Sequence, residues 1–302
     1  MIRMTRDGEW LTGQLETPQP ELTYGDLLRE QWGLPKKMAH LLFQHKEVLL
    51  NDQPINQNHK VTETGTLRMR VCLPEEYGVE PKVTNLEILY EDDHVLIVNK
   101  PAGMLLHPTE SSHTETLDHY IAGLLQQQGI QAKVRHVHRL DQDTSGAVLY
   151  AKHALASSLL DEMLRHRKIS RMYMAVVQGK IPQDTGKIDA PIGRDRHHPS
   201  RRRVTPQGEH AVTLYRVIKR FPYATQVECS LETGRTHQIR VHLSHLGFPL
   251  VGDTLYGGKK NGISRQALHA FKLSLIHPFG EEKITVEAPM PQELQQLISR
   301  LS

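Results

Sequence analysis

One aspartate, Asp141, occupies a short polar loop whose residue types suit acid–base or nucleophilic chemistry. Arg139 precedes it, turn-forming residues follow at 142–146, and an apolar run to Ala151 predicts a buried strand. A carboxylate on a loop anchored by a strand is held in place and stays reachable. The same residues also fit a structural interpretation, in which Asp141 caps the turn and pairs with Arg139. Further motifs must decide between the two.

A second polar turn, at residues 233–238, carries a cation that could assist such a carboxylate. Gly234 permits a tight turn, and apolar residues recur at helical spacing over 239–246 before Gly247. Arg235 would then lie at a helix N-terminus, where backbone N–H groups add to its positive charge. We expect this spot to hold a phosphate or to orient an acidic catalytic residue.

The histidines and cysteines do not predict a metal site. His237, His242 and His245 lack an HExxH pattern and have no cysteine or carboxylate at ligand spacing, so ordinary structural or surface roles are favoured. Cys72 and Cys229 form no CxxC pair, which predicts neither a disulfide framework nor a thiolate zinc site. We expect no metal and no cofactor.

A basic segment at residues 193–203 suggests contact with a phosphate backbone. Strand signals flank it, so we expect a hairpin loop that grips nucleic acid, with a mobile surface loop as the alternative. Its cations are Arg194, Arg196, Arg201, Arg202 and Arg203, beside His197 and His198. The whole chain of 302 residues carries a net charge of only +3, so the clustering matters more than the sum.

The length predicts two domains of unequal size. The first ten residues lack the apolar core of a signal peptide, and no run approaches the roughly 18 apolar residues of a membrane span. We expect a soluble, cytoplasmic protein. Nothing in the sequence demands more than a monomer.

Residues 1–75 predict a small domain, and the Pro-, Gly- and Glu-rich residues 76–84 predict a linker. A strand or arm comes first, then a capping box at residues 23–26 opens a helix of about three turns. Pro35 can open a second helix that presents Lys36 and Lys37. A turn at Asn51 and Asp52 then precedes a strand at 65–71.

Residues 85–302 predict a larger α+β domain with a mixed, largely antiparallel central sheet flanked by helices and loops. A hairpin is expected over residues 86–98, and helices over 116–128, 153–167 and 292–301. Further strands are expected at 173–177, 212–218, 225–231, 268–275 and 283–286. No glycine fingerprint for a dinucleotide or a P-loop interrupts this pattern.

Taken together, these motifs resemble the RluA and RluD-type RNA pseudouridine synthases over about residues 85–291. The resemblance rests on HRLDQDTSG at 138–146, NKPAG at 99–103, TGRTHQIRVHL at 233–243, GD-x-x-YG at 252–257, RQALHA at 265–270 and AP-x-P at 288–291. Residues 1–75 similarly resemble a divergent S4 RNA-binding domain, which makes Lys36 and Lys37 candidate RNA contacts.

The resemblance implies roles for four residues. Asp141 would be the catalytic aspartate, Tyr173 the tyrosine that stacks on the target base, and Arg235 the basic partner of the aspartate. Arg139 would enter the RNA helix as the target nucleotide leaves it. Arg171 stands where the family usually has lysine, and the KPAG turn with Lys100 is interpreted as structural.

The activity implied is isomerisation of uridine to pseudouridine in a structured RNA, with ribosomal RNA favoured over tRNA as the partner. Two other functions stay open. A ribosome assembly factor could keep the fold and bind RNA without catalysis, although an intact set of catalytic residues argues against it. An RNA N-glycosidase would also use a carboxylate and a stacked base.

Overall fold

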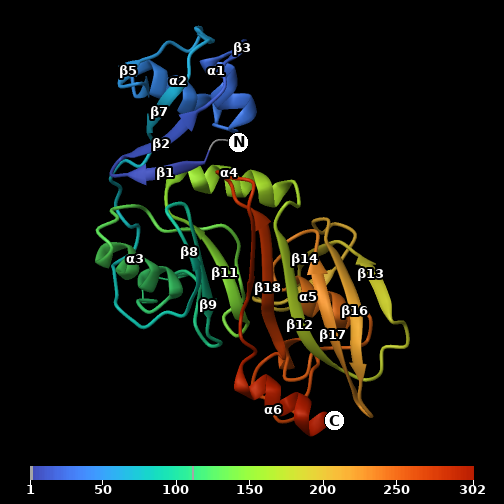
Figure 1. Ribbon diagram of the computed structural model, residues 1–302. Helices are drawn as coiled ribbons and strands as arrows, with labels where there is room; N and C mark the ends of the chain where they lie inside the picture. Colours follow the sequence, from blue (N-terminus) through green and yellow to red (C-terminus); the bar gives the residue numbers. More distant parts are fainter. Residues whose placement is uncertain (1–2, 111) are drawn as a thin grey trace.

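The computed structural model describes residues 3–110 and 112–302, and it contains two main sheets (Figure 1). The smaller sheet belongs to the N-terminal domain and is antiparallel throughout. In the order β1-β2-β7-β4-β5, its strands span Met4–Asp7, Trp10–Leu15, Gly65–Arg70, Val48–Leu50 and Gln53–Pro54. A separate pair joins β3 (Gln19–Thr23) to β6 (Lys60–Val61). The predicted N-terminal strand or arm is therefore a hairpin followed by a third strand.

The helices of this domain begin where the sequence predicts. Thr23 and Asp26 form the expected capping box, and α1 (Tyr24–Asp26) continues into a π-helical turn, η1 (Leu27–Gln31). This unit is shorter than the three turns predicted, because Gly33, with φ +66°, reverses the chain. The second helix, α2, spans Lys36–Gln44 directly after Pro35.

The turn between β4 and β5 is confirmed. Asn51 and Asp52 have φ values of 49° and 62°, the left-handed conformation that a two-residue hairpin turn requires. Asparagine and aspartate tolerate this conformation better than other non-glycine residues do, so the pair forms the tip without glycine.

The larger sheet confirms the mixed, largely antiparallel prediction. It runs β13-β16-β17-β12-β18-β11-β9-β8, and among the strands that the structure describes only β11 and β18 pair in parallel. In that order the strands span Thr185–Asp189, Val212–Arg220, Ala224–Leu231, Ser170–Gln178, Leu268–Ile276, Ser145–Ala151, Val95–Lys100 and Ile88–Glu91. Two short strands, β10 (Arg135–His136) and β19 (Lys283–Glu287), pair with β11 and β18 respectively.

The helices of the larger domain lie within the predicted ranges, except that the helix predicted over 239–246 begins one residue earlier. They are α3 (Leu117–Gln127), α4 (Ala154–Arg165), α5 (Gln238–His245) and α6 (Gln292–Leu301), with a 3-10 turn, η2 (Thr254–Tyr256). Figure 1 shows α4 at the end of the large sheet that faces the small domain and α6 at the opposite end. Across the described residues, each helix is too short or too polar to serve as a membrane span.

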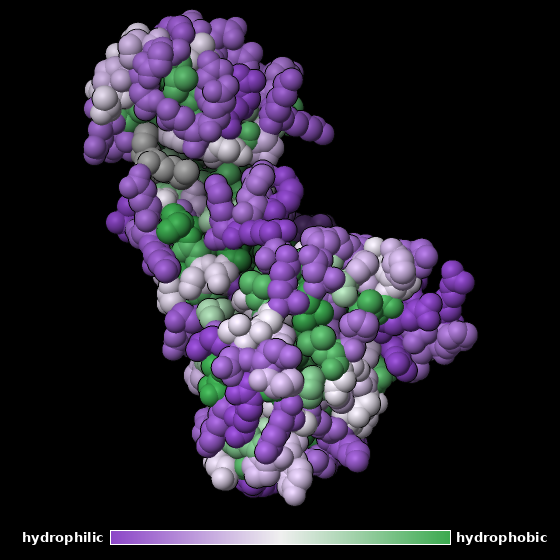
Figure 2. Space-filling model, turned by 90° about the vertical axis from the view of Figure 1, so that its right-hand side faces the viewer, coloured by the Kyte–Doolittle hydropathy of each residue, from purple (hydrophilic) through white to green (hydrophobic). Residues whose placement is uncertain are grey.

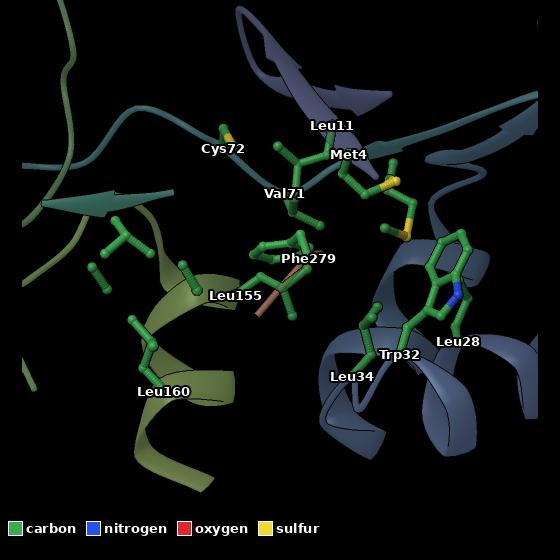
Figure 3. Packing of buried hydrophobic residues seen from close by; sticks show 14 of the residues in the cluster. Met4, Leu11, Leu28, Trp32, Leu34, Val71, Cys72, Leu155, Leu160 and Phe279 are labelled. Atoms are coloured by element: carbon green, nitrogen blue, oxygen red, sulfur yellow. The ribbon is translucent and has the colours of Figure 1, made fainter. Parts of the chain in front are cut away.

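The two domains share one hydrophobic core. Met4, Leu11 and Trp32 of the small domain belong to the same buried cluster as Leu155 of α4 and Phe279 (Figure 3). In the space-filling view of Figure 2 the small domain forms a lobe above the larger one, and the two meet at a narrower waist. Because burial of apolar surface is the main favourable term in association, we expect the two lobes to hold a fixed orientation.

Residues 76–84, the predicted linker, form no helix or strand. They lie against α3 and the segment that follows it. The Lys82 N–H donates to the carbonyl of His119 on α3 over 2.9 Å, and the Val134 N–H donates to the carbonyl of Tyr77 over 3.0 Å. A Cβ on Gly123 would come within 2.0 Å of the Lys82 carbonyl oxygen, so the strap fits against α3 at that glycine. The segment connects the domains as a bound strap.

Candidate active site

Asp141 lies at the start of a tight turn that leads into β11. The Thr144 N–H donates to the Asp141 carbonyl over 3.0 Å, and all seven residues of β11 are buried. At Gly146, φ is +118° and a Cβ would stand 2.2 Å from the carbonyl oxygen of Ala270 on β18. Only glycine permits this close approach, which explains the glycine in the TSG motif.

Two buried cations fix the loop that carries Asp141. The Lys100 ammonium donates to the carbonyls of Pro101, Met104 and Gln142 over 2.7–2.9 Å. Burial lowers the pKa of Lys100 to about 7, while the charges of Asp141 and Asp143 oppose that shift.

From the other side, the guanidinium of Arg265 donates to the carbonyl of Asp143 and to the hydroxyl of Ser145, over 2.9 and 3.2 Å. The contacts of Lys100 fit the structural role expected for the KPAG turn. Together the two cations hold the turn on both sides, so Asp141 projects from a rigid support.

Asp141 borders a cavity of about 570 Å³. A smaller hollow of about 180 Å³ adjoins it, and Arg139, Asp141 and Arg235 line both. The larger cavity also brings together Tyr173, Arg171 and Arg240. The three residues that the sequence predicted to be catalytic, Asp141, Tyr173 and Arg235, therefore meet at one site.

Tyr173 reaches the cavity from an irregular point of the sheet. The pairing of β12 with β18 shifts register between Met172 and Met174, and such bulges redirect side chains. Burial raises the pKa of Tyr173, the charge of Arg171 lowers it, and that of Asp141 raises it again. The net shift is upward, so the ring is neutral at physiological pH and presents a flat face suited to stacking.

The predicted ion pair between Asp141 and Arg235 is wrong. Arg240, and not Arg235, donates from Nη1 to Asp141 Oδ2 over 3.0 Å. Arg235 precedes α5, and its guanidinium pairs with the Glu209 carboxylate and donates to the carbonyl of His210. Because α5 begins only at Gln238, the first turn of the helix aims Arg240 at Asp141. Arg235 remains in the cavity wall.

A sequence signal for Arg240 existed. It is a charged residue between Ile239 and Val241 in a stretch whose residues are almost all buried. A buried charge requires a partner, so an arginine inside an apolar run indicates an ion pair elsewhere in the fold. The family resemblance pointed instead to Arg235, the arginine in the glycine turn.

Three side chains surround Arg240: Asp141, Asp253 and Tyr256. It donates to both carboxylate oxygens of Asp253, over 2.7 and 2.9 Å, and its guanidinium lies 5.0 Å from the ring centre of Tyr256. Burial alone would lower the pKa of Arg240, but hydrogen bonds to Asp253 and the charges of both carboxylates outweigh burial and raise it. Arg240 thus carries a permanent charge beside Asp141.

His237 completes this side of the site. It has φ +58°, its Nδ1 lies 2.8 Å from the Tyr256 hydroxyl, and its Nε2 lies 3.9 Å from Asp141 Oδ2. Burial lowers its pKa, opposed in part by the charge of Asp141. His242 is instead a core residue that contacts Thr213 and the carbonyl of Ala190. Within residues 3–110 and 112–302 no three His, Cys, Asp or Glu side chains gather as metal ligands.

The predicted RNA contacts fall into three places. Arg139 is exposed between the two hollows, where its Nη2 lies 3.4 Å from the Thr236 hydroxyl. The basic segment is a hairpin, as predicted, with β14 (Ile192–Arg194) paired to β15 (Arg202–Val204). It touches the active site because the Arg202 N–H donates to the Tyr256 hydroxyl over 2.9 Å. Lys36 and Lys37 are exposed on α2 in the other domain.

Comparison with known proteins assigns the class. Residues 94–245 match the family described as RNA pseudouridylate synthase, and residues 11–67 match the RluD ribosomal pseudouridine synthase N-terminal domain. The chain belongs to the RluD-type RNA pseudouridine synthases, enzymes that isomerise uridine in RNA. The family and the enzyme class expected from the motifs are therefore confirmed.

Individual relatives agree with this class. The chain is 43% identical to the uncharacterized RNA pseudouridine synthase YhcT of Bacillus subtilis, over 98% of this chain and 95% of that protein. It is 40% identical to ribosomal large subunit pseudouridine synthase D of Xanthomonas campestris, over 84% and 81% respectively. Among solved structures, human RNA pseudouridylate synthase domain containing 1 aligns with a TM-score of 0.56 and 28% identity, covering 74% of this chain and 97% of that one.

Proposed function

We propose that the chain isomerises uridine in large-subunit ribosomal RNA, with Asp141 as the catalytic residue. The observation that carries this is the placement of Asp141 on a rigid loop, paired with Arg240 and facing the same cavity as Tyr173. A relative named ribosomal large subunit pseudouridine synthase D, 40% identical over 84% of this chain, supports the choice of RNA. We further propose that the enzyme acts as a monomer in the cytoplasm.

The reaction needs few groups. The N1–C1′ bond breaks, the freed uracil rotates, and a C5–C1′ bond forms while C5 loses a proton and N1 gains one, so no atom is gained or lost overall. Asp141 assists cleavage at the sugar much as a glycosidase carboxylate does. Arg240 holds this carboxylate in place, because its Nη1 donates to Asp141 Oδ2 over 3.0 Å. Tyr173 holds the detached uracil by stacking, worth about 1–3 kcal/mol per base.

Arg139 serves the step before chemistry. A base paired in a duplex is unreachable, so the nucleotide must be flipped out at a cost of a few kcal/mol. Arg139 is exposed at the rim of the cavity that Asp141 borders. A planar guanidinium can stack in the vacated gap and hydrogen-bond to the bases that remain. Arg235, in the same wall, would contact a phosphate or the target nucleotide.

Two basic surfaces would hold the rest of the RNA. The β14–β15 hairpin contributes Arg194, Arg196, Arg201, Arg202 and Arg203 next to the cavity. The small domain contributes Lys36 and Lys37, and we propose that it binds RNA as S4 domains do. Because the two domains share one core, both surfaces would engage a single folded RNA at a fixed spacing.

The first prediction concerns Asp141→Asn. The substitution keeps the shape of the side chain and removes its charge, so we expect folding and RNA affinity to be retained and the rate of pseudouridine formation to fall about 10³-fold or more. Purified protein would be incubated with ribosomal RNA from a deletion strain, and pseudouridine counted by nucleoside mass spectrometry. A rate within about tenfold of the parent would show that another carboxylate is catalytic.

The same assay separates the alternatives. Pseudouridine formed by the parent protein supports the synthase, whereas free uracil with an abasic site indicates an N-glycosidase. Unchanged RNA together with tight binding indicates an assembly factor. Mapping pseudouridines across the RNA of parent and deletion strains then identifies the target nucleotide.

A further inference from the structure

The guanidinium of Arg240 donates more hydrogen bonds to one of its two carboxylate partners than to the other. Its Nε and Nη2 donate to the two oxygens of Asp253, over 2.7 and 2.9 Å, while Nη1 alone donates to Asp141 Oδ2 over 3.0 Å. Within the described part of the chain, Asp141 Oδ1 accepts no hydrogen bond. One oxygen of Asp141 is therefore held and the other is open to the cavity that it lines.

Burial of Asp253 stabilises this arrangement of hydrogen bonds. The Asp253 side chain is 1% exposed, against 24% for Asp141, so Asp253 has no water to replace Arg240 as its partner. The loop that carries Asp253 is fixed as well, because a Cβ on Gly252 would lie 2.0 Å from the carbonyl oxygen of Arg265. The ring of Tyr256 lies against the same guanidinium, 5.0 Å from it. Asp253 thus has no freedom to release Arg240.

We propose that Asp253 is a positioning residue for the reaction: by occupying two N–H groups of Arg240, it turns a single N–H toward Asp141 and leaves the second carboxylate oxygen of Asp141 free for the nucleotide. The inference rests on the proposed function of Asp141. Without Asp253, Arg240 could pair with both oxygens of Asp141, the geometry that arginine and carboxylate prefer. Asp141 would then be both covered and less basic.

A titration of the RNA-free protein tests the charge side of this inference. Carbon-13 NMR of labelled aspartate carboxyl groups would follow Asp141 against pH in the parent and in Asp253→Asn. With one negative charge removed beyond Arg240, the ionised form of Asp141 gains stability, so its titration midpoint should move to lower pH by about one pH unit or more. An unchanged midpoint would overturn the inference.

The matched control is Asp184→Asn. Asp184 also pairs with an arginine, Arg220, over 2.7 Å, but its side chain is 84% exposed and it lies outside the site. This control should leave the Asp141 titration where it is in the parent. The charged and titrating groups around Asp141 are the same in both variants. Lys100, Tyr173, His237, Arg240 and Tyr256 interact with it, and Arg139, Arg171 and Arg235 line the same cavity.

Single-turnover kinetics test the geometric side. We expect Asp253→Asn to bind RNA with a dissociation constant within about twofold of the parent and to react roughly 10- to 100-fold more slowly. If Asp253 acts through Arg240, adding Asp253→Asn to an Arg240→Lys variant should slow the reaction by less than about threefold. Equal slowing in both backgrounds would contradict it.

A second variant covers a folding defect. If Asp253→Asn melts too low to assay, Asp253→Glu keeps the charge and displaces the carboxylate by one methylene. The titration of Asp141 should then stay near that of the parent while the rate falls, and a parent-like rate would overturn the inference. An inactive parent protein would contradict the proposed function. The titration of Asp141 needs no RNA, so it would still test the effect of Asp253 on Asp141 in that case.

Discussion

At the scale of residues, the site combines a held carboxylate with an uncharged aromatic face. Arg240 holds Asp141, while burial raises the pKa of Tyr173 and keeps its phenol neutral. Within the described residues no hydrogen bond restrains the Tyr173 hydroxyl. The ring is therefore the part of this side chain whose position the surroundings determine, so we expect stacking to be its main contribution.

Two substitutions of Tyr173 should therefore have different effects. Tyr173→Phe keeps the ring and should retain most of the pseudouridine-forming rate. Tyr173→Leu removes a stacking contribution of about 1–3 kcal/mol and should react about 5- to 150-fold more slowly. Both variants would be compared in single-turnover assays after their thermal stability has been matched. A phenylalanine variant as slow as the leucine variant would instead assign the hydroxyl a chemical role.

At the scale of elements, strand β11 fixes the position of the site. It lies between β9 and β18, and its parallel pairing with β18 consists of Ser145 with His269 and Gly146 with Ala270. This is the only parallel pair among the neighbours of the large sheet within the described residues. The close approach of the two backbones at Gly146 brings the Asp141 turn beside Arg265, which clamps it.

Gly146→Ala tests how far the sheet depends on this approach. A Cβ there would meet the Ala270 carbonyl oxygen at 2.2 Å, and the residue would keep an unfavourable φ of +118°. We expect the free energy of unfolding in urea to fall by about 3 kcal/mol or more, from strain and overpacking together.

Gly103→Ala is the control for that experiment. Gly103 also has a positive φ, 82°, but nothing lies within 4 Å of its Cβ position, so a loss of only about 1 kcal/mol is expected. Equal losses for the two variants would mean that the backbone conformation, and not the contact with β18, sets the requirement for glycine.

At the scale of the whole molecule, a chain of hydrogen bonds joins the two domains. The Ala156 N–H donates to His153 Nδ1 at the start of α4, His153 Nε2 lies 2.9 Å from His94 Nδ1, and His94 Nε2 lies 2.9 Å from the Met4 carbonyl. Each contact has a donor and an acceptor only when both histidines are neutral with the proton on Nε2. Phe279 stacks on His94 and covers the pair, at a centroid distance of 4.2 Å.

Acid should therefore weaken the protein. Burial lowers the pKa of His94 and that of His153, so both stay neutral in the fold below the ordinary histidine pKa, where the unfolded chain binds protons. The contribution of these two histidines to stability is then constant above about pH 6.5 and falls as pH drops below it, by about 1.4 kcal/mol per pH unit for each histidine. The charged and titrating groups facing the pair are Arg6, Asp92, Asp93, Arg135 and His277.

Urea unfolding between pH 7.5 and 5.0 measures this dependence. His94→Gln should reduce the slope of the free energy of unfolding against pH by the contribution of one histidine, about 1.4 kcal/mol per pH unit. Glutamine can accept and donate hydrogen bonds at the same place, but it does not titrate. His40→Gln, at an exposed position on α2, should reproduce the slope of the parent. Identical slopes in all three proteins would remove His94 as the source of the acid sensitivity.

The sequence by itself determined the local structure and indicated the loop that carries Asp141 as the candidate catalytic loop. The helix at 292–301, the turn at Asn51 and Asp52, the basic hairpin and the strand after Asp141 all follow from short-range patterns, because backbone preferences and apolar periodicity act over a few residues. The motifs also predicted that Asp141, Tyr173 and Arg235 share one site, and all three line one cavity.

Only the tertiary structure decided which charges meet. Arg240 contacts Asp141 across 99 positions of sequence and Asp253 across 13, and His94 meets His153 across 59. Such pairs depend on how α5, the η2 loop and α4 pack against the sheet, and no local pattern encodes that packing. The sequence could therefore indicate that Asp141 has a cationic partner, whereas the choice of Arg240 over Arg235 required the direction in which α5 leaves its turn.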